Sequence, residues 1–208
     1  MRRPPRHDWS AFRAAERPVA DFPRHAPNRL ALAYANSYHI GMSSLAFQRV
    51  YELVHTHEGW RAERFFLDGE GVPLSVERDT PLGDCNAIAF SVSFEEDYIN
   101  LLRMLDRARI PLRRSQRGPW DPLIILGGAC AAINPLPMAE FVDVFALGAA
   151  ENLLGTLLPA LAEEGDRDAL LERLAATPGY YVPERHQPEE LDGPNKLRKL
   201  ELTADQMA

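Results

Sequence analysis

Short, nearly continuous apolar runs alternate with longer amphipathic stretches between Arg29 and Leu161. Strands that are covered on both faces carry few polar residues, and the crossovers between parallel strands usually contain a helix with one apolar face. The alternation therefore predicts an α/β domain with a parallel sheet. We expect its five strands at Leu30–Tyr34, Ala62–Leu67, Ala87–Ser91, Leu123–Leu126 and Val144–Leu147.

The connecting helices show the complementary pattern. Apolar side chains recur at three- and four-residue steps in 42–54, 98–105 and 153–161, as on the buried face of a helix. Ser43 or Ser44 can cap the first of these helices, because a serine hydroxyl accepts N-terminal backbone N–H groups. Residues 68–85 have only a weak apolar trio and predict an irregular crossover. The elements together predict a doubly wound, flavodoxin-like or Rossmann-like sheet with the strand order 2-1-3-4-5.

Both ends of the chain depart from this pattern. The first 24 residues contain six arginines, which predict a basic extension that is either solvated or packed. The segment from Tyr180 onward is charged and interrupted by prolines, so we expect it to bury little and to act as a linker. The chain is thus divided into an N-terminal basic extension at 1–27, the α/β domain at 28–165, and a short helix with a linker at 166–208.

Composition narrows the class of protein. The chain has 208 residues, of which 46% are hydrophobic and 25% charged, with a net charge of −7. This charge does not favour nucleic acid as a partner. A membrane helix needs about 18 consecutive apolar residues; no such window or signal-peptide core is present, so we expect a cytoplasmic protein without a membrane partner. Cys85 and Cys130 have no metal-ligand spacing, as expected in a reducing compartment.

The loops that follow the predicted strands carry the candidate chemistry. Ligands of open parallel sheets bind at the carboxyl ends of the strands, where the strand order reverses. The loops "NSYHIGMSS", "SVSFEED", "GGACAAINP" and "GAAEN" should meet there, and all are rich in small and polar residues. The candidate ligand-binding residues are Asn36, Ser37, His39, Gly41, Ser91, Ser93, Gly127, Gly128 and Gly148.

Several familiar sites are absent from these loops. The sequence has no phosphate loop of the form G-x-x-x-x-G-K-[ST], no G-x-G-x-x-G after the first strand and no G-x-S-x-G, so standard nucleotide folds and hydrolases are not indicated. Glu95, Glu96 and Asp97 suit the N-terminus of a helix, where acidic groups interact favourably with the helix dipole. The loops therefore offer no obvious pair of general acid and base.

Four strings carry a resemblance to a known family. "NSYHIGMSSLAFQ", "AFSVSFEEDY", "LGGACAAINPLP" and "GAAEN" resemble the N-terminal region of the uncharacterised B12-binding radical SAM proteins, and the similarity covers roughly residues 28 to 186. The resemblance implies a cobalamin-binding-like domain that is not catalytic on its own. Its implied partners are a corrinoid ligand, cobalamin, and the protein's own C-terminal radical SAM domain.

The resemblance also assigns roles to individual residues. Ser91 and Ser93 match the serine motif after the third strand, and Gly127 and Gly128 match the Gly-Gly pair after the fourth. His39 is the implied candidate for the lower cobalt ligand. The better-known cobalamin domains have D-x-H-x-x-G at this place. Here a serine replaces the aspartate and the glycine comes one residue early, so the carboxylate that would orient a histidine ligand is missing.

Radical SAM chemistry also requires a C-x-x-x-C-x-x-C motif, which holds a [4Fe–4S] cluster that binds S-adenosylmethionine. Cys85 and Cys130 cannot supply it, so the cluster and S-adenosylmethionine are expected only in the full-length protein. Two other functions stay open. The domain could keep the fold without a cofactor and act as an interaction or scaffolding domain, or it could be a flavodoxin-like binder of FMN or another phosphate ligand, since "SYHIGMSS" offers a helix N-terminus.

Overall fold

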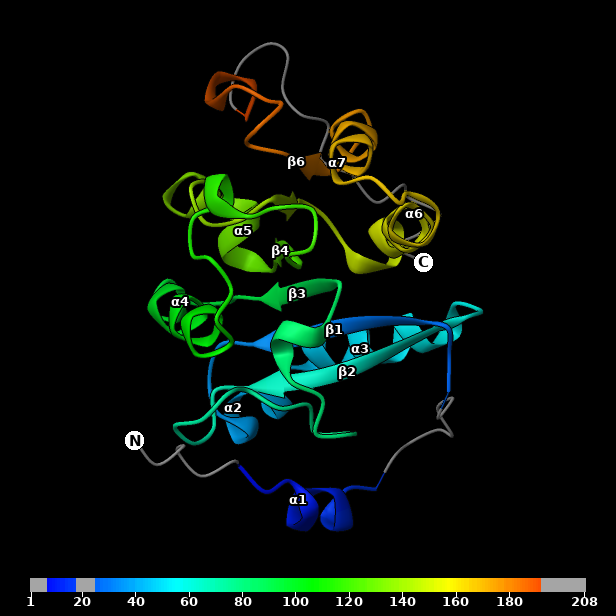
Figure 1. The fold of residues 1–208 in the computed structure, drawn as a ribbon, viewed down its shortest axis with the longest axis vertical. Helices are drawn as coiled ribbons and strands as arrows, with labels where there is room; N and C mark the ends of the chain where they lie inside the picture. Colours follow the sequence, from blue (N-terminus) through cyan, green and yellow to red (C-terminus); the bar gives the residue numbers. More distant parts are fainter. Residues whose placement is uncertain (1–6, 18–24, 192–208) are drawn as a thin grey trace.

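The computed structural model describes residues 7–17 and 25–191, which form one layered α/β unit (Figure 1). Its single sheet has the order β2-β1-β3-β4-β5-β6, and the first five strands are parallel. The strands are β1 (Asn28–Tyr34), β2 (Trp60–Phe66), β3 (Ala87–Ser91), β4 (Leu123–Gly127), β5 (Val144–Ala146) and β6 (Tyr180–Tyr181). The predicted doubly wound order 2-1-3-4-5 is confirmed, and a sixth strand, antiparallel to β5, extends it.

Helices cover both faces of this sheet, as the amphipathic crossovers require. They are α1 (Ser10–Ala15), α2 (Tyr38–Ser43), α3 (Leu45–Thr56), α4 (Asp97–Arg107), α5 (Ala129–Ile133), α6 (Ala150–Glu163) and α7 (Arg167–Ala175). Short 3-10 helices lie at Leu82–Asp84, Arg114–Gln116, Leu136–Met138 and Pro188–Leu191. Apolar side chains of α4 and α5 share one core cluster with one face of the sheet, and those of α6 and α7 share a second cluster with the opposite face.

The strand register aligns the carboxyl ends of the central strands. Tyr34 is paired with Ser91, and Ser91 is paired with Gly127. Because side chains alternate between the two faces of a strand, Ser91 and Gly127 lie on the same face as Ala89 and Ile125, the face covered by α3 and α6. The fold thus brings the loops after the first, third and fourth strands to one edge of the sheet.

The single helix predicted at 42–54 is divided in two. α2 ends at Ser43, and the hydroxyl of Ser44 accepts the backbone N–H of Phe47 at 3.3 Å, which caps α3. α2 packs so closely on β2 that a Cβ at Gly41 would lie 2.4 Å from a ring carbon of Phe66. A glycine is needed there for packing, which periodicity could not show.

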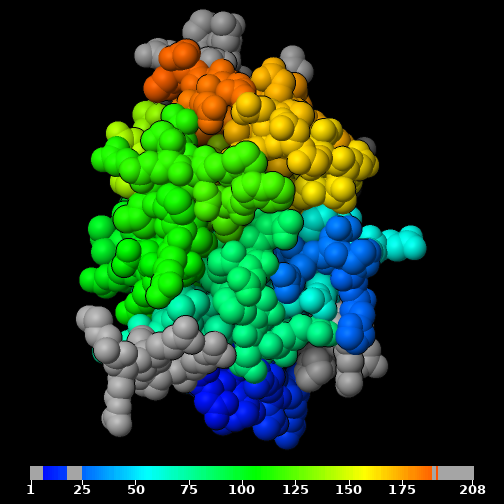
Figure 2. All heavy atoms as spheres, in the orientation of Figure 1, coloured from blue at the N-terminus to red at the C-terminus, as the bar shows by residue number. Residues whose placement is uncertain are grey.

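Both ends of the described chain contain side chains that pack into the domain. Trp9 is buried and donates its indole N–H to the carbonyl oxygen of Leu74 at 2.9 Å. Tyr180 and Tyr181 are also buried, and the Tyr180 hydroxyl donates to the carbonyl oxygen of Leu153 at 2.7 Å. The expectation that the segment from Tyr180 buries little is therefore wrong for its first residues. Figure 2 shows α1 in blue and the β6 region in orange, each packed against the body.

The crossover between β2 and β3 is irregular, as predicted, and it protects the exposed edge of β2. Val76 donates its backbone N–H to the carbonyl oxygen of Arg64 at 2.9 Å, so this edge is paired locally. The Arg64 side chain forms ion pairs with Glu77 at 2.6 Å and with Glu16 at 2.7 Å, and its guanidinium lies 4.7 Å from the centre of the Tyr51 ring. Through Glu77 these contacts connect the crossover to β2, and through Glu16 they connect the end of α1 to β2.

A buried arginine organises the loop before β4. Arg117 donates to a carboxylate oxygen of Asp143 at 2.9 Å and to the carbonyl oxygens of Pro111 and Leu112 in this loop and of Phe141 in the loop before β5. Asp143 also accepts the backbone N–H of Ile124 at 2.7 Å and pairs with Arg167 at 2.9 Å. Burial of two ions is costly unless their hydrogen bonds are satisfied, and this network satisfies them. It holds the amino end of the central sheet, opposite the candidate site.

Candidate functional site

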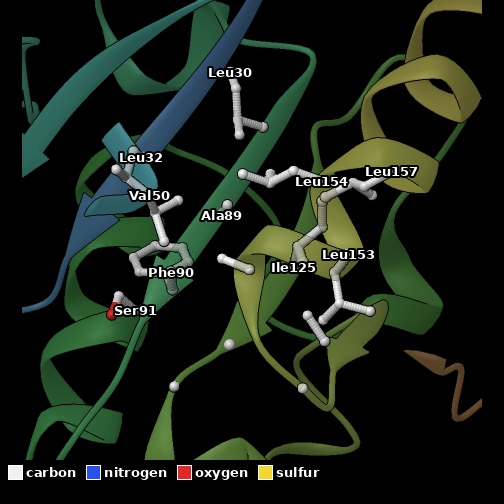
Figure 3. A pocket seen from close by; sticks show the side chains of 15 residues that line it. Leu30, Leu32, Val50, Ala89, Phe90, Ser91, Ile125, Leu153, Leu154 and Leu157 are labelled. Carbon is white, nitrogen blue, oxygen red and sulfur yellow. The ribbon is translucent and has the colours of Figure 1, made fainter. Parts of the chain in front are cut away.

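An apolar pocket lies between the sheet and the helices α3 and α6, near the carboxyl edge (Figure 3). Its floor is lined by small residues on this face of β3, β4 and β5 and just after β4 and β5. Their short side chains leave room above the sheet. These residues are Ala89, Ser91, Gly127, Gly128, Ala146 and Gly148. The empty space amounts to about 570 Å³ when the solvent at its mouth is included.

Aliphatic side chains form the walls of the pocket. They come from β1, α3, β4 and α6, namely Leu30, Leu32, Val50, Ile125, Leu153, Leu154 and Leu157. Figure 3 shows Leu30 near one end and the Ser91 hydroxyl near the other. None of the fifteen lining residues is charged, and the Ser91 hydroxyl is the only polar side chain among them. The pocket can therefore hold an apolar or aromatic group and offer it one hydrogen bond.

The structure separates the nine candidate residues into two groups. Ser91, Gly127, Gly128 and Gly148 line the pocket. The others do not line it, and they are Asn36, Ser37, His39, Gly41 and Ser93. The small residues within the strands and the leucines of α6 also line the pocket and were not among the predicted residues. The signal that could have found them is the run of small side chains at alternate positions of neighbouring strands.

The polar groups of the first loop hold that loop in place. The Asn36 side-chain amide donates to Asp97 at 2.9 Å, while its oxygen accepts the backbone N–H of Ser37 at 2.8 Å. Asp97 is buried and also accepts from the Asn100 amide at 3.2 Å. The backbone N–H of Tyr38 donates to Asp68 at 2.7 Å. These residues connect the carboxyl end of β1 to α4 and to the crossover after β2.

His39 lies away from the pocket. It belongs to α2, its residue is exposed, and its ring centre is 5.7 Å from the ring of Phe12 in α1 and 5.7 Å from that of Tyr38. Within the described parts of the chain, no group of three or more histidine, cysteine or acidic residues could hold a metal ion.

The two glycines at the end of β4 have different roles. Gly128 has a φ of 99°, and a Cβ there would lie 2.5 Å from the carbonyl oxygen of Val92. It therefore allows the loops after β3 and β4 to approach each other. A Cβ at Gly127 would meet the Ala146 Cβ at 3.8 Å, an ordinary contact distance. The fold tolerates a methyl group at Gly127, but that methyl would occupy the floor of the pocket.

Exposed apolar side chains surround this edge of the sheet. Leu45 is 81% exposed, Phe94 61% and Ile133 78%, and they follow β1, β3 and β4 respectively. The same loops and the helices that follow them also expose Ile40, Ile99 and Leu136. We call these six residues the apolar rim. Clustered apolar side chains at a surface are typical of a binding face.

One ion pair bridges the two helices beside the pocket. Nε of Arg49 in α3 lies 3.3 Å from a carboxylate oxygen of Glu151 in α6, and Arg49 also pairs with Glu52 at 2.8 Å. Arg49 and Glu151 each adjoin a pocket residue, Val50 and Ala150. Both side chains of the bridge are about half-exposed.

The two cysteines lie outside the pocket, and both are buried. Desolvation raises the pKa of the Cys85 thiol to about 12. Burial also raises the pKa of the Cys130 thiol, which lies at the start of α5. Both side chains are therefore protonated near neutral pH and poorly suited to metal binding. No helix within 7–17 or 25–191 is both long and apolar enough to span a bilayer.

Fold and site together define a doubly wound α/β domain with an apolar pocket at the carboxyl edge of its sheet. The family model described as "Radical SAM proteins, N-terminal" matches residues 46–183, well over half of the chain, so the chain belongs to this family. The match runs through β6, in agreement with the burial of that strand.

Among curated proteins, an uncharacterised protein of Methanocaldococcus jannaschii is 25% identical over 123 residues. The aligned segment covers 59% of this chain and 24% of that relative, so the match spans about a quarter of the longer protein. No solved structure matched the chain. The resemblance to the N-terminal region of radical SAM proteins is thus confirmed.

Proposed function

We propose that this chain is a cobalamin-binding accessory domain of a radical SAM enzyme. The pocket at the carboxyl edge supports the proposal most directly, because it lies where doubly wound sheets bind their ligands. It is lined by aliphatic side chains and by Ser91, Gly127 and Gly128, which the resemblance assigns to a corrinoid site, together with Gly148.

The residues present fit the nucleotide end of a corrinoid. The aliphatic walls would hold its heterocyclic base, and the Ser91 hydroxyl at the end of the pocket would supply a hydrogen bond to it. Gly127 leaves the space that the base requires, since even one methyl at this position would project into the floor. A bound corrinoid would supply methyl-transfer or radical chemistry, which the residues of the pocket alone do not provide.

The proposal does not use His39 as a cobalt ligand. Its ring lies beside Phe12 and Tyr38, and the residue does not line the pocket. We therefore expect the His39→Ala variant to bind hydroxocobalamin with the same absorption spectrum as the unmodified chain. A change in the corrinoid bands of this variant would identify His39 as a ligand after all.

The catalytic parts of the enzyme would lie in a further domain. A [4Fe–4S] cluster and S-adenosylmethionine belong to the radical SAM part of such proteins, and the two buried cysteines of this chain do not fit a cluster. We propose the protein's own C-terminal radical SAM domain as the partner. In the longer relative, about three quarters of the chain lie outside the aligned segment.

The apolar rim favours a second candidate, an interaction or scaffolding domain without a cofactor. Leu45, Phe94 and Ile133 are well exposed at the edge where a partner would approach. In this case the pocket would have no ligand, and the rim alone would bind the radical SAM part. The two candidates differ in one measurable respect, the binding of a corrinoid by the pocket.

The deciding experiment is a titration of the purified chain with hydroxocobalamin, followed by the shift of the corrinoid absorption bands. We expect saturable binding in the micromolar range, and weaker binding by roughly 5- to 100-fold in Gly127→Ala, the size of effect expected when one methyl overpacks a site. Gly155→Ala is the matched control, because a Cβ at Gly155 in α6 has no atom within 4 Å.

Each outcome separates the candidates. Equal binding by the Gly127→Ala variant would place the corrinoid elsewhere and contradict the pocket assignment. Absence of binding up to high micromolar concentrations would favour the interaction domain. A purified protein that is yellow and carries FMN would instead support a flavodoxin-like function.

A further inference from the structure

We propose that Arg49 recognises the phosphate of the ligand, exchanging Glu151 for the ligand when the pocket is filled. This inference rests on the proposed function, since it concerns a ligand with an apolar base and an adjoining phosphodiester. Arg49 would thus take part in binding although it does not itself line the pocket.

The first observation is the distribution of charge at this edge of the sheet. The segments 35–48, 92–102 and 127–166 contain no lysine or arginine. They include every loop at the carboxyl ends of β1, β3, β4 and β5 and the whole of α6. Arg49 is the first cationic residue after β1, and its guanidinium reaches across to α6.

The charged side chains of these three segments are all acidic. Glu95 and Glu96 are exposed in the loop after β3, and Glu151 lies in the first turn of α6. A phosphate at this edge would be repelled by these carboxylates unless a cation compensated for them. Because the pocket itself has no charge, this compensation must come from its margin.

The second observation is that both side chains of the Arg49–Glu151 bridge are accessible to solvent, and that Arg49 keeps a second partner, Glu52 at 2.8 Å, when this bridge opens. The side chains of Arg49 and Glu151 are 50% and 48% exposed, and ion pairs at such positions add little to stability. An arginine can form two parallel hydrogen bonds with a phosphate, which are shorter and stronger than neutral ones. Release of Glu151 in favour of a phosphate therefore costs little and gains a charge-assisted contact.

The location of the bridge is consistent with this exchange. Arg49 adjoins Val50 in the wall of the pocket, and Glu151 adjoins Ala150. If the base of a ligand lies between α3 and α6, the phosphate attached to it would lie next to one of these two helices. The guanidinium would then exchange Glu151 for the phosphate and keep its pair with Glu52.

The test compares two probes, hydroxocobalamin and cobinamide, which has the same corrin ring but lacks the nucleotide and its phosphate. We expect Arg49→Gln to weaken binding of hydroxocobalamin roughly five- to tenfold, as for one half-exposed charge-assisted contact, and to leave cobinamide within about twofold. Arg49→Lys should retain part of the affinity. Arg173→Gln is the matched control, because Arg173 also pairs with two glutamates but lies in α7.

Glu151→Gln distinguishes recognition from a merely structural bridge. If Arg49 binds the phosphate, loss of its competitor should tighten hydroxocobalamin binding by roughly two- to fivefold. If the bridge only holds α3 to α6, both Glu151→Gln and Arg49→Gln should weaken binding of both probes. That result, or an Arg49→Gln variant that binds hydroxocobalamin like the unmodified chain, overturns the inference.

The two proposals fail in different ways. When the unmodified chain binds hydroxocobalamin more tightly than cobinamide but Arg49→Gln keeps this preference, the pocket function stands and the role of Arg49 is refuted. When the unmodified chain binds neither probe, or binds both equally, the nucleotide pocket is itself refuted and Arg49 loses its role with it.

Discussion

Replacement of Gly128 by alanine should destabilise the domain severely, whereas the same replacement at the adjacent Gly127 should not. With a φ of 99° and a ψ of −176°, Gly128 occupies a region that is essentially restricted to glycine. Forcing another residue into it costs about 1–3 kcal/mol. The new Cβ would also lie 2.5 Å from the Val92 carbonyl oxygen, and relief of such overpacking costs about 1–3 kcal/mol more.

The sum predicts a loss of roughly 2–6 kcal/mol in the free energy of unfolding for Gly128→Ala. Gly127→Ala should be neutral or stabilising by about 0.4–1 kcal/mol, because alanine restricts the unfolded chain and its Cβ meets Ala146 at an ordinary 3.8 Å. Urea denaturation followed by circular dichroism measures both changes. Equal stabilities of the two variants would refute the claim that Gly128 is required by a close approach of two loops.

Three further changes test other parts of the structure. Arg117→Met should lower the free energy of unfolding by about 3–5 kcal/mol, because Asp143 loses a buried partner; a loss below 1 kcal/mol in urea denaturation would contradict it. Trp9→Ala should cost about 3–5 kcal/mol in the same assay, because the Trp9 ring is buried in a core cluster before the start of α1, and an unchanged midpoint would refute this. Desolvation lowers the pKa of His55 in the folded chain, and its Nε2 accepts a backbone N–H. The contribution of neutral His55 to stability is therefore complete above the unfolded pKa of about 6.5 and is lost as the pH falls below that value. Thermal unfolding from pH 7.5 to 5 should show this loss in the native chain and a smaller one in His55→Gln, and parallel curves would refute it.

The sheet could be predicted from the sequence because its strands are strongly patterned. The predicted strand Ala87–Ser91 agrees with β3 at both ends, and the other four differ by no more than two residues at either end. β6 was missed because it has only two residues, Tyr180 and Tyr181, within a segment rich in prolines and charges. Their burial depends on pairing with β5, a tertiary contact that has no local periodicity.

The site was predicted only in part, for a related reason. Loop composition indicated the edge at which the pocket lies, and Ser91 and Gly127 were among the predicted residues because they end adjacent strands. Composition could not distinguish a residue that lines a pocket from one that stabilises its own loop. Asn36 is polar because it connects the first loop to Asp97, and Gly41 is small because Phe66 packs against it. Only the three-dimensional contacts separate these roles.

The two lateral borders of the sheet restrict how the domain can associate with other chains. Unpaired strand edges tend to recruit strands from other molecules. Here the backbone of β2 is engaged at Arg64, whose carbonyl oxygen accepts from Val76 of the crossover, and β6 at the other border has only two residues. Lengthening of the sheet by a foreign strand is therefore disfavoured on both sides. Association with another chain would then depend on contacts between side chains. The shape and charge of those side chains would set its specificity, and single substitutions could change it.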